Sequence, residues 1–67
     1  MITVNGQPRE LPAQGSLIEL IDDLVKAPGG RGVAVAVNGA VVPRAAWATT
    51  RLVAGDRVEL LTATQGG

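Results

Sequence analysis

The 67-residue chain ends in Thr64-Gln65-Gly66-Gly67, and this stretch carries the group with the clearest potential chemistry. Glycine has no Cβ, so a chain end of two glycines can enter a narrow enzyme channel, and the terminal acyl carbon is open to attack. We therefore expect Gly67 to carry an acyl group at its carboxylate and Gly66 to leave the approach unhindered. The alternative is a passive terminus, as at most chain ends.

The composition leaves few other chemistries. The chain contains neither His nor Cys, so we expect no zinc site and no Cys or His nucleophile or base. Six acidic and six basic residues give a net charge of zero, which disfavours binding to nucleic acid or an anionic membrane. No apolar run approaches the roughly 20 residues that span a bilayer, and the N-terminus has no basic signal segment. We expect a cytoplasmic protein.

Two motifs outside the C-terminus could suggest a catalytic or a phosphate-binding site, but their spacing favours neither. Asp22 and Asp23 are adjacent on a predicted helix and diverge, and Lys26 follows Asp22 at ion-pair spacing, so a solvated face is expected. Pro28-Gly29-Gly30 follows a helix instead of opening one and lacks the Gly-Lys-Ser/Thr ending of a phosphate loop. Since no acid, base and nucleophile converge, an enzyme is the least favoured class.

Two Asn-Gly pairs predict hairpins that must position the terminus. Asn5-Gly6 and Asn38-Gly39 both tolerate the positive φ angles of a type I′ turn. Pro8 indicates an edge strand after the first turn. The valines and alanines of the run from 33 to 37 should face opposite ways. Apolar residues on both faces indicate a strand inside the sheet or beneath a partner. The expected strands are Ile2–Val4, Gln7–Leu11, Val33–Val37 and Ala40–Val42.

One helix and one further strand complete the pattern. Ser16 and Glu19 form a capping box, and an apolar stripe continues to Val25 before Pro28-Gly29-Gly30 ends the helix. Residues 44–52 are expected to be irregular or a short helical turn. The last strand, Arg57–Thr62, should direct Val58 and Leu60 to the helix and Leu61 outward.

This order predicts an α+β fold of the ubiquitin-like β-grasp type, a mixed sheet of four to five strands with one helix across one face. The first strand can pair in parallel with the last because the connection between them includes the helix. Residues 1–62 would form the domain, and residues 63–67 would be a flexible tail that leaves from the middle of the sheet.

Several motifs together resemble the thiamine-pathway sulfur carrier proteins, small β-grasp domains that end in Gly-Gly. The related molybdopterin-synthase carriers share the Gly-Asp turn and the Gly-Gly end, but Val-Pro-Arg followed by Trp is similar to the thiamine type. Many relatives have an aliphatic residue at the position of Thr64. The motifs are Val35-Ala36-Val37-Asn38-Gly39, Val41-Val42-Pro43-Arg44 with Trp47 and Ala48, Gly55-Asp56-Arg57-Val58-Glu59, and Gly66-Gly67.

The resemblance implies a carrier that catalyses nothing and binds no cofactor. An E1-like activating enzyme would use ATP to adenylate the carboxylate of Gly67, and a sulfur donor such as a cysteine desulfurase would convert the adenylate to a thiocarboxylate. Thiazole synthase would then receive the sulfur.

Contacts with these partners are expected at Thr64, Gln65, Leu61 and Arg44. Trp47, the single aromatic residue, is expected to anchor the core. A molybdopterin-type carrier, a ubiquitin-like protein modifier and a plain interaction module are the alternatives.

Overall fold

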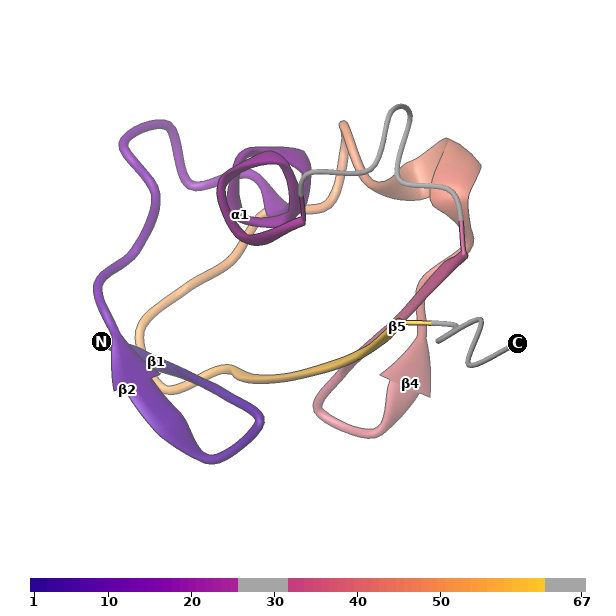
Figure 1. Cartoon of the computed structure of the whole chain (residues 1–67). Coiled ribbons are helices and arrows are strands. Elements are labelled where there is room, and N and C mark those ends of the chain that lie inside the picture. Colours follow the sequence, from indigo (N-terminus) through magenta and orange to yellow (C-terminus); the bar gives the residue numbers. More distant parts are fainter. Residues whose placement is uncertain (26–31, 63–67) are drawn as a thin grey trace.

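The computed structural model describes residues 1–25 and 32–62, which form one mixed sheet with a helix across one face (Figure 1). This is the predicted ubiquitin-like β-grasp architecture. In chain order the elements are β1 (Ile2–Val4), β2 (Gln7–Arg9), α1 (Leu17–Leu24), β3 (Val33–Val37), β4 (Ala40–Val41), the short 3-10 helix η2 (Arg44–Ala46) and β5 (Arg57–Thr62).

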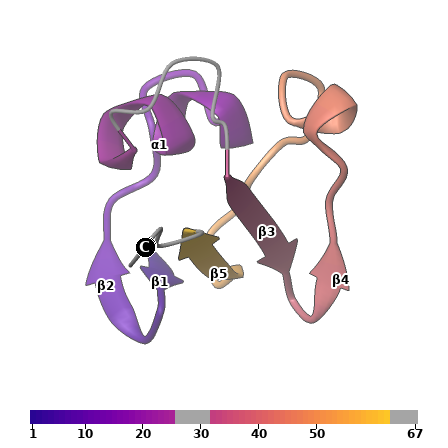
Figure 2. The same ribbon diagram turned by 45° about the vertical axis from the view of Figure 1, so that its right-hand side comes forward.

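The sheet has five strands in the order β2-β1-β5-β3-β4, which Figure 2 shows from one edge to the other. β1 and β5 are parallel, with Val4 opposite Val58, and the other neighbouring strands are antiparallel. The predicted parallel pairing of the first and last strands is confirmed. β5 therefore occupies the centre and joins two separate hairpins.

Both hairpins turn at their Asn-Gly pairs as predicted. The φ angles are 51° at Asn5 and 83° at Gly6, and 51° at Asn38 and 87° at Gly39. Positive φ at both central residues is the type I′ conformation, whose twist matches that of the strands it connects.

Two strands end earlier than predicted. β2 stops at Arg9 and does not reach Leu11, because Arg9 lies opposite Ile2, the first residue of its partner strand. β4 stops at Val41, although the N–H of Val42 still donates to the carbonyl of Val35 at 2.9 Å.

The helix begins as predicted. The Ser16 hydroxyl accepts the N–H of Glu19 at 3.4 Å, and the Glu19 carboxylate accepts the N–H of Ser16 at 3.3 Å. The N–H groups of Leu17 and Ile18 donate to the carbonyls of Thr50 and Trp47, at 2.9 and 3.2 Å. The first N–H groups of the helix, which have no intrahelical partner, are thus satisfied.

The end of the helix differs from the prediction. α1 stops at Leu24, and Val25 is extended, with φ −115° and ψ 121°, a conformation that suits its β-branched side chain. The predicted stop at Pro28-Gly29-Gly30 and the predicted Asp22–Lys26 pair lie outside the described residues. Over residues 1–25 and 32–62, no helix is long and apolar enough to cross a membrane.

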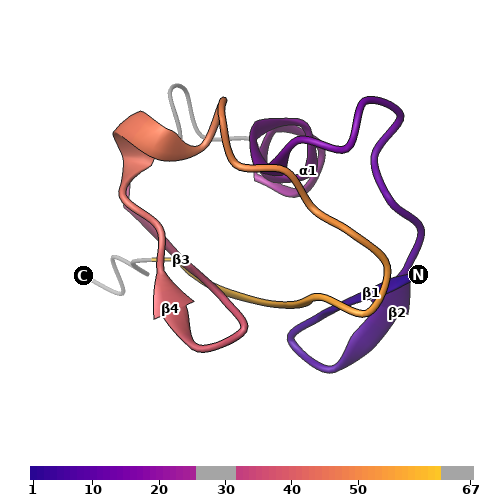
Figure 3. The same cartoon turned by 180° about the vertical axis from the view of Figure 1, so that it is seen from behind.

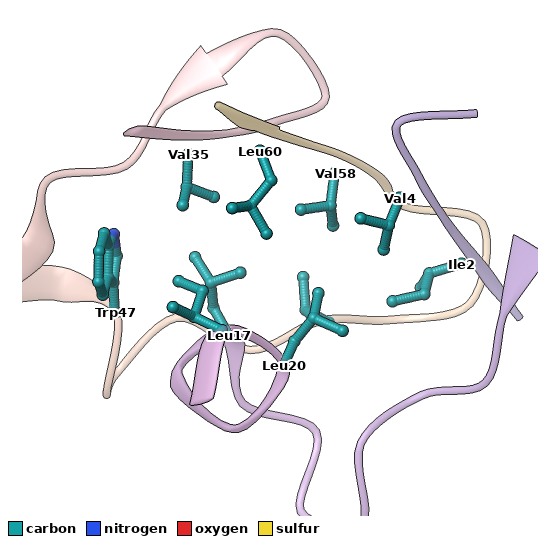
Figure 4. Packing of buried hydrophobic residues seen from close by; sticks show 10 residues of the cluster. Ile2, Val4, Leu17, Leu20, Val35, Trp47, Val58 and Leu60 are labelled. Atoms are coloured by element: carbon teal, nitrogen blue, oxygen red, sulfur yellow. The ribbon is translucent and has the colours of Figure 1, made fainter. Parts of the chain in front are cut away.

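The core fills the space between the sheet and α1 (Figure 4). Trp47 closes one end: its side chain is 2% exposed, and its Nε1–H donates to the carbonyl of Val42 at 3.0 Å. The prediction that Trp47 anchors the core is confirmed. In the described part of the chain, the ten buried residues are Ile2, Val4, Leu17, Leu20, Ile21, Val35, Trp47, Leu52, Val58 and Leu60.

The connection from η2 to β5 runs past α1 and then crosses to the β1 side of the sheet (Figure 3). On the way, the N–H of Leu52 donates to the carbonyl of Gly15 at 2.7 Å, and that of Gly55 donates to Met1 at 2.8 Å. These bonds bring the chain to the start of β5 beside β1.

Candidate functional site

Four of the predicted site residues, Thr64, Gln65, Gly66 and Gly67, lie outside the described residues. The structure describes the strand that leads to them, because β5 ends at Thr62. The contacts that fix β5 therefore also fix the point at which residues 63–67 begin.

β5 is paired unequally on its two sides. Its antiparallel register with β3 extends from Val37 opposite Val58 to Val33 opposite Thr62. Its parallel register with β1 reaches only from Thr3 opposite Arg57 to Val4 opposite Val58, because β1 then enters its hairpin turn. Within residues 1–25 and 32–62, the second half of β5 thus has no neighbouring strand on the β1 side.

Asn5 contacts β5 at this point. Its backbone N–H donates to the carbonyl of Val58 at 2.9 Å, which continues the strand pairing. Its side-chain Oδ1 then accepts the N–H of Leu60 at 2.9 Å, and its Nδ2 donates to the carbonyl of Leu60 at 3.1 Å. The amide satisfies both backbone groups of Leu60, two residues before Thr62.

Asn38 makes a related contact at the start of β5, from the other hairpin. Its backbone N–H donates to the carbonyl of Arg57 at 2.7 Å, and its Oδ1 accepts the N–H of Arg57 at 2.9 Å. Its Nδ2 donates to Asp56 Oδ1 at 2.9 Å, and Asp56 Oδ2 accepts the N–H of Val53 at 2.9 Å. Asn38 of the second Asn-Gly motif is thus hydrogen-bonded to Asp56 of the Gly-Asp motif and to the residue that follows it.

The Asn-Gly pattern predicts the turns at Asn5 and Asn38 but not these side-chain contacts. The one signal in the sequence is that both turns use Asn, whose side chain both donates and accepts.

An exposed apolar surface lies beside the end of β5, on the face opposite the helix. Leu61 is 72% exposed, as predicted, and Ala34 lies directly across from it on β3. Ala36 lies opposite Val41, which is 78% exposed. Residues directly across from each other share a face of the sheet, so these side chains form one surface. We name Leu61, Ala34, Ala36 and Val41 the outer patch. The exposed carboxylate-bearing residue Glu59 lies opposite Ala36 on the same face and borders it.

Arg44 is not part of this surface. It is exposed at the start of η2, which lies in the same layer as α1 (Figures 1 and 3). Leu61 faces the other side of the sheet. The structure therefore separates two residues that were expected to contact partners.

The described surface includes the following two depressions. One, of about 260 Å³, opens beside the end of β5 and is mostly apolar. The other, of about 310 Å³, lies near the ion pair of Arg9 and Asp23, whose Nη2 and Oδ2 atoms are 3.2 Å apart. The first is lined by Val4, Asn5, Leu24, Val25, Leu60 and Thr62.

The charged groups of the described part provide no reactive centre. Hydrogen bonds from the N–H of Gln14 and from Ser16 hold the pKa of the Glu19 carboxyl below its ordinary value, and this group caps α1. Within residues 1–25 and 32–62, no three His, Cys, Asp or Glu side chains gather where they could hold a metal ion.

Comparison with known proteins covers nearly the whole chain. The ThiS family model matches residues 2–67. A crystal structure of a thiamine biosynthesis protein (ThiS) from Geobacter metallireducens is 35% identical, with 98% of this chain and 97% of that chain covered and a TM-score of 0.74. A solution NMR structure of a thiamine biosynthesis protein from the same organism is also 35% identical, with coverage of 98% and 86% and a TM-score of 0.76. Among curated protein sequences, none matches significantly.

Proposed function

Since this chain belongs to the ThiS family, we propose that it is a cytoplasmic sulfur carrier of thiamine biosynthesis that carries sulfur as a thiocarboxylate on Gly67. The observation that carries this proposal is the family match, which extends through Gly66 and Gly67. The central position of β5 supports it, because the strand that leads to these glycines is the one that joins both hairpins.

The proposed chemistry requires activation of the carboxylate. A terminal carboxyl has a pKa of about 3.5, so it is ionised at neutral pH and a poor electrophile. Attack of a carboxylate oxygen on the α-phosphorus of ATP gives an acyl adenylate and releases pyrophosphate. The terminal sulfur of a persulfide on a donor of the cysteine desulfurase type attacks the acyl carbon and displaces AMP, which leaves an acyl disulfide. A second thiol then attacks the donor's sulfur in this S–S bond, supplies the two electrons and releases the thiocarboxylate on Gly67. In this proposal the partner enzymes supply ATP and the catalytic groups, and the carrier catalyses nothing.

The outer patch is the surface that we propose for docking to the E1-like activating enzyme and then to thiazole synthase. It is apolar and exposed, and it lies beside the end of β5. A partner that covers it would be placed to receive Thr64 and Gln65 in a channel leading to its active site. Arg44, in the layer of the helix, would make a separate contact through its guanidinium.

Intact-mass measurement tests the function. The chain is incubated with its activating enzyme, ATP and a sulfur donor, and we expect the mass change of one oxygen replaced by sulfur. A variant without Gly66 and Gly67 is the control and should stay unchanged. An unchanged wild-type mass with active partners would refute the proposal.

The same experiment in cell extract separates the carrier from a ubiquitin-like modifier, which would also use an activated Gly67. A modifier would appear as conjugates on lysine side chains of other proteins. Free chain with a thiocarboxylate is the result that we expect.

A further inference from the structure

The side-chain amide of Asn5 takes the place of the backbone groups that a longer β1 strand would offer to β5. In a parallel pair, the bond from the N–H of Asn5 to Val58 would be followed by a bond from the N–H of Leu60 to the backbone carbonyl of Asn5. The next N–H of the β1 strand would then donate to the carbonyl of Leu60. The hairpin turn removes both backbone groups. The Oδ1 and Nδ2 atoms of Asn5 take their places at 2.9 and 3.1 Å.

Asparagine fits both demands of this position. The φ angle of 51° disfavours most side chains, and Gly, Asn and Asp are the residues that tolerate it best. Glycine has no amide, and an ionised aspartate accepts but does not donate. Asparagine therefore makes the turn and also pairs with both backbone groups of Leu60.

We propose that Asn5 is a positioning residue for the proposed carrier reaction, because its side-chain amide fixes the end of β5 from which residues 63–67 continue. The proposal rests on the proposed function, because it assigns Asn5 a role in presenting Gly67. Leu60 is followed by Leu61 of the outer patch and by Thr62, so Asn5 sets the geometry between the docking surface and the start of residues 63–67.

Docking and presentation should respond differently to substitution. The outer patch determines how well the carrier binds, which is reflected in the KM of the activating enzyme for the carrier. Asn5 determines how often the bound carboxylate reaches the geometry for attack, which is reflected in kcat. A split between KM and kcat therefore distinguishes a positioning role from a contribution to binding.

The experiment compares Asn5→Gly with Asn38→Gly. Both substitutions give a Gly-Gly pair, which can keep the type I′ turn with glycine at φ 51°, and both remove a side-chain amide that bonds to β5. They differ in place: Asn38 holds Arg57 at the start of the strand, whereas Asn5 holds Leu60 near its end. Adenylation of each carrier is measured by pyrophosphate release, at a temperature where circular dichroism shows both variants to be folded.

We expect Asn5→Gly to lower kcat roughly tenfold or more with little change in KM, and Asn38→Gly to change kcat by less than about threefold. Equal effects of the two substitutions, or none in Asn5→Gly, would overturn the positioning role while wild-type activation leaves the proposed function intact. If the wild-type chain is not adenylated by an active enzyme, the proposed function itself fails and the positioning role with it.

Amide hydrogen exchange provides a measurement that does not depend on activity. Asn5→Gly should accelerate exchange at Leu60 and Leu61 and leave Arg57 near its wild-type rate, and Asn38→Gly should do the reverse. Unchanged exchange at Leu60 in Asn5→Gly would show that the amide does not hold this end of the strand, and would also overturn the proposal.

Discussion

Trp47 connects α1 to a segment distant in sequence, and Glu19 connects α1 to the loop immediately before it. Trp47 fills one end of the core and donates to the carbonyl of Val42, while its own carbonyl accepts the N–H of Ile18. Glu19 accepts N–H groups from Gln14 and Ser16 and so ties the incoming loop to the first turn of α1. In a chain without other aromatic residues and without cysteines, such residues have a large share in stability.

Replacing Trp47 with Phe should lower the free energy of unfolding by about 2 kcal/mol, because it reduces buried area and leaves the Val42 carbonyl without its donor. Urea denaturation followed by circular dichroism measures this loss, since no other tryptophan remains as a fluorescent probe. A loss below about 0.5 kcal/mol would contradict the anchoring role.

Glu19 makes stability depend on pH in the acidic range. Its folded pKa is lowered from the ordinary 4.5, so its ionised form stabilises the fold above pH 4.5. That contribution is lost as the pH falls from 4.5 through the lowered pKa of the folded state. The stability difference between wild type and Glu19→Gln should be largest near neutral pH and should shrink as the solution is acidified. Thermal unfolding across this range measures it, and a constant difference would disprove the assignment.

Among the elements, β5 combines two functions on its two faces. Val58 and Leu60 point into the core, and Leu61 points out to the outer patch. The sequence pattern of this strand predicted both directions. It could not predict the contact of Asn5 with Leu60, which spans 55 residues, because the preference of Asn for positive φ constrains the backbone and says nothing about where the amide is directed.

The ends of the elements show the same limit. β2 ends at Arg9, which pairs with Ile2, the first residue of β1. The end of β2 thus depends on its pairing with β1 and not on the residues of β2 alone. The predicted turns, capping box and alternation were local signals, and these were confirmed. The docking role of the outer patch stays a prediction, because the sequence and the fold identify an exposed apolar face but not the protein that covers it.

Replacing Leu61 with Ser should raise the KM of the activating enzyme by roughly tenfold with little loss of stability, because the side chain is mostly exposed and its removal weakens docking. Val53→Ser is the matched control: Val53 is also apolar and 61% exposed, but it lies outside the outer patch. Equal KM values for the two variants would argue against docking through the outer patch.

At the scale of the whole molecule, folding and carrier chemistry are assigned to different parts of the chain. Among the residues that the structure describes, the ten buried core residues lie between Ile2 and Leu60. Deleting Gly66 and Gly67 should therefore leave the thermal unfolding temperature within about 2 °C of wild type while abolishing adenylation. Calorimetry and pyrophosphate release measure the two effects. A marked fall in the unfolding temperature would show that the glycines also contribute to the fold.

The central place of β5 also bears on how the protein is made. Four of the five strands belong to two hairpins that pair with each other only through β5, and a single hairpin is marginally stable in water. A nascent chain on the ribosome that has not yet exposed Arg57–Thr62 cannot complete its sheet. A product of premature termination before Arg57 would remain open to proteases. Only chains synthesised through β5, the strand that precedes the glycines, would therefore complete the fold and resist proteolysis.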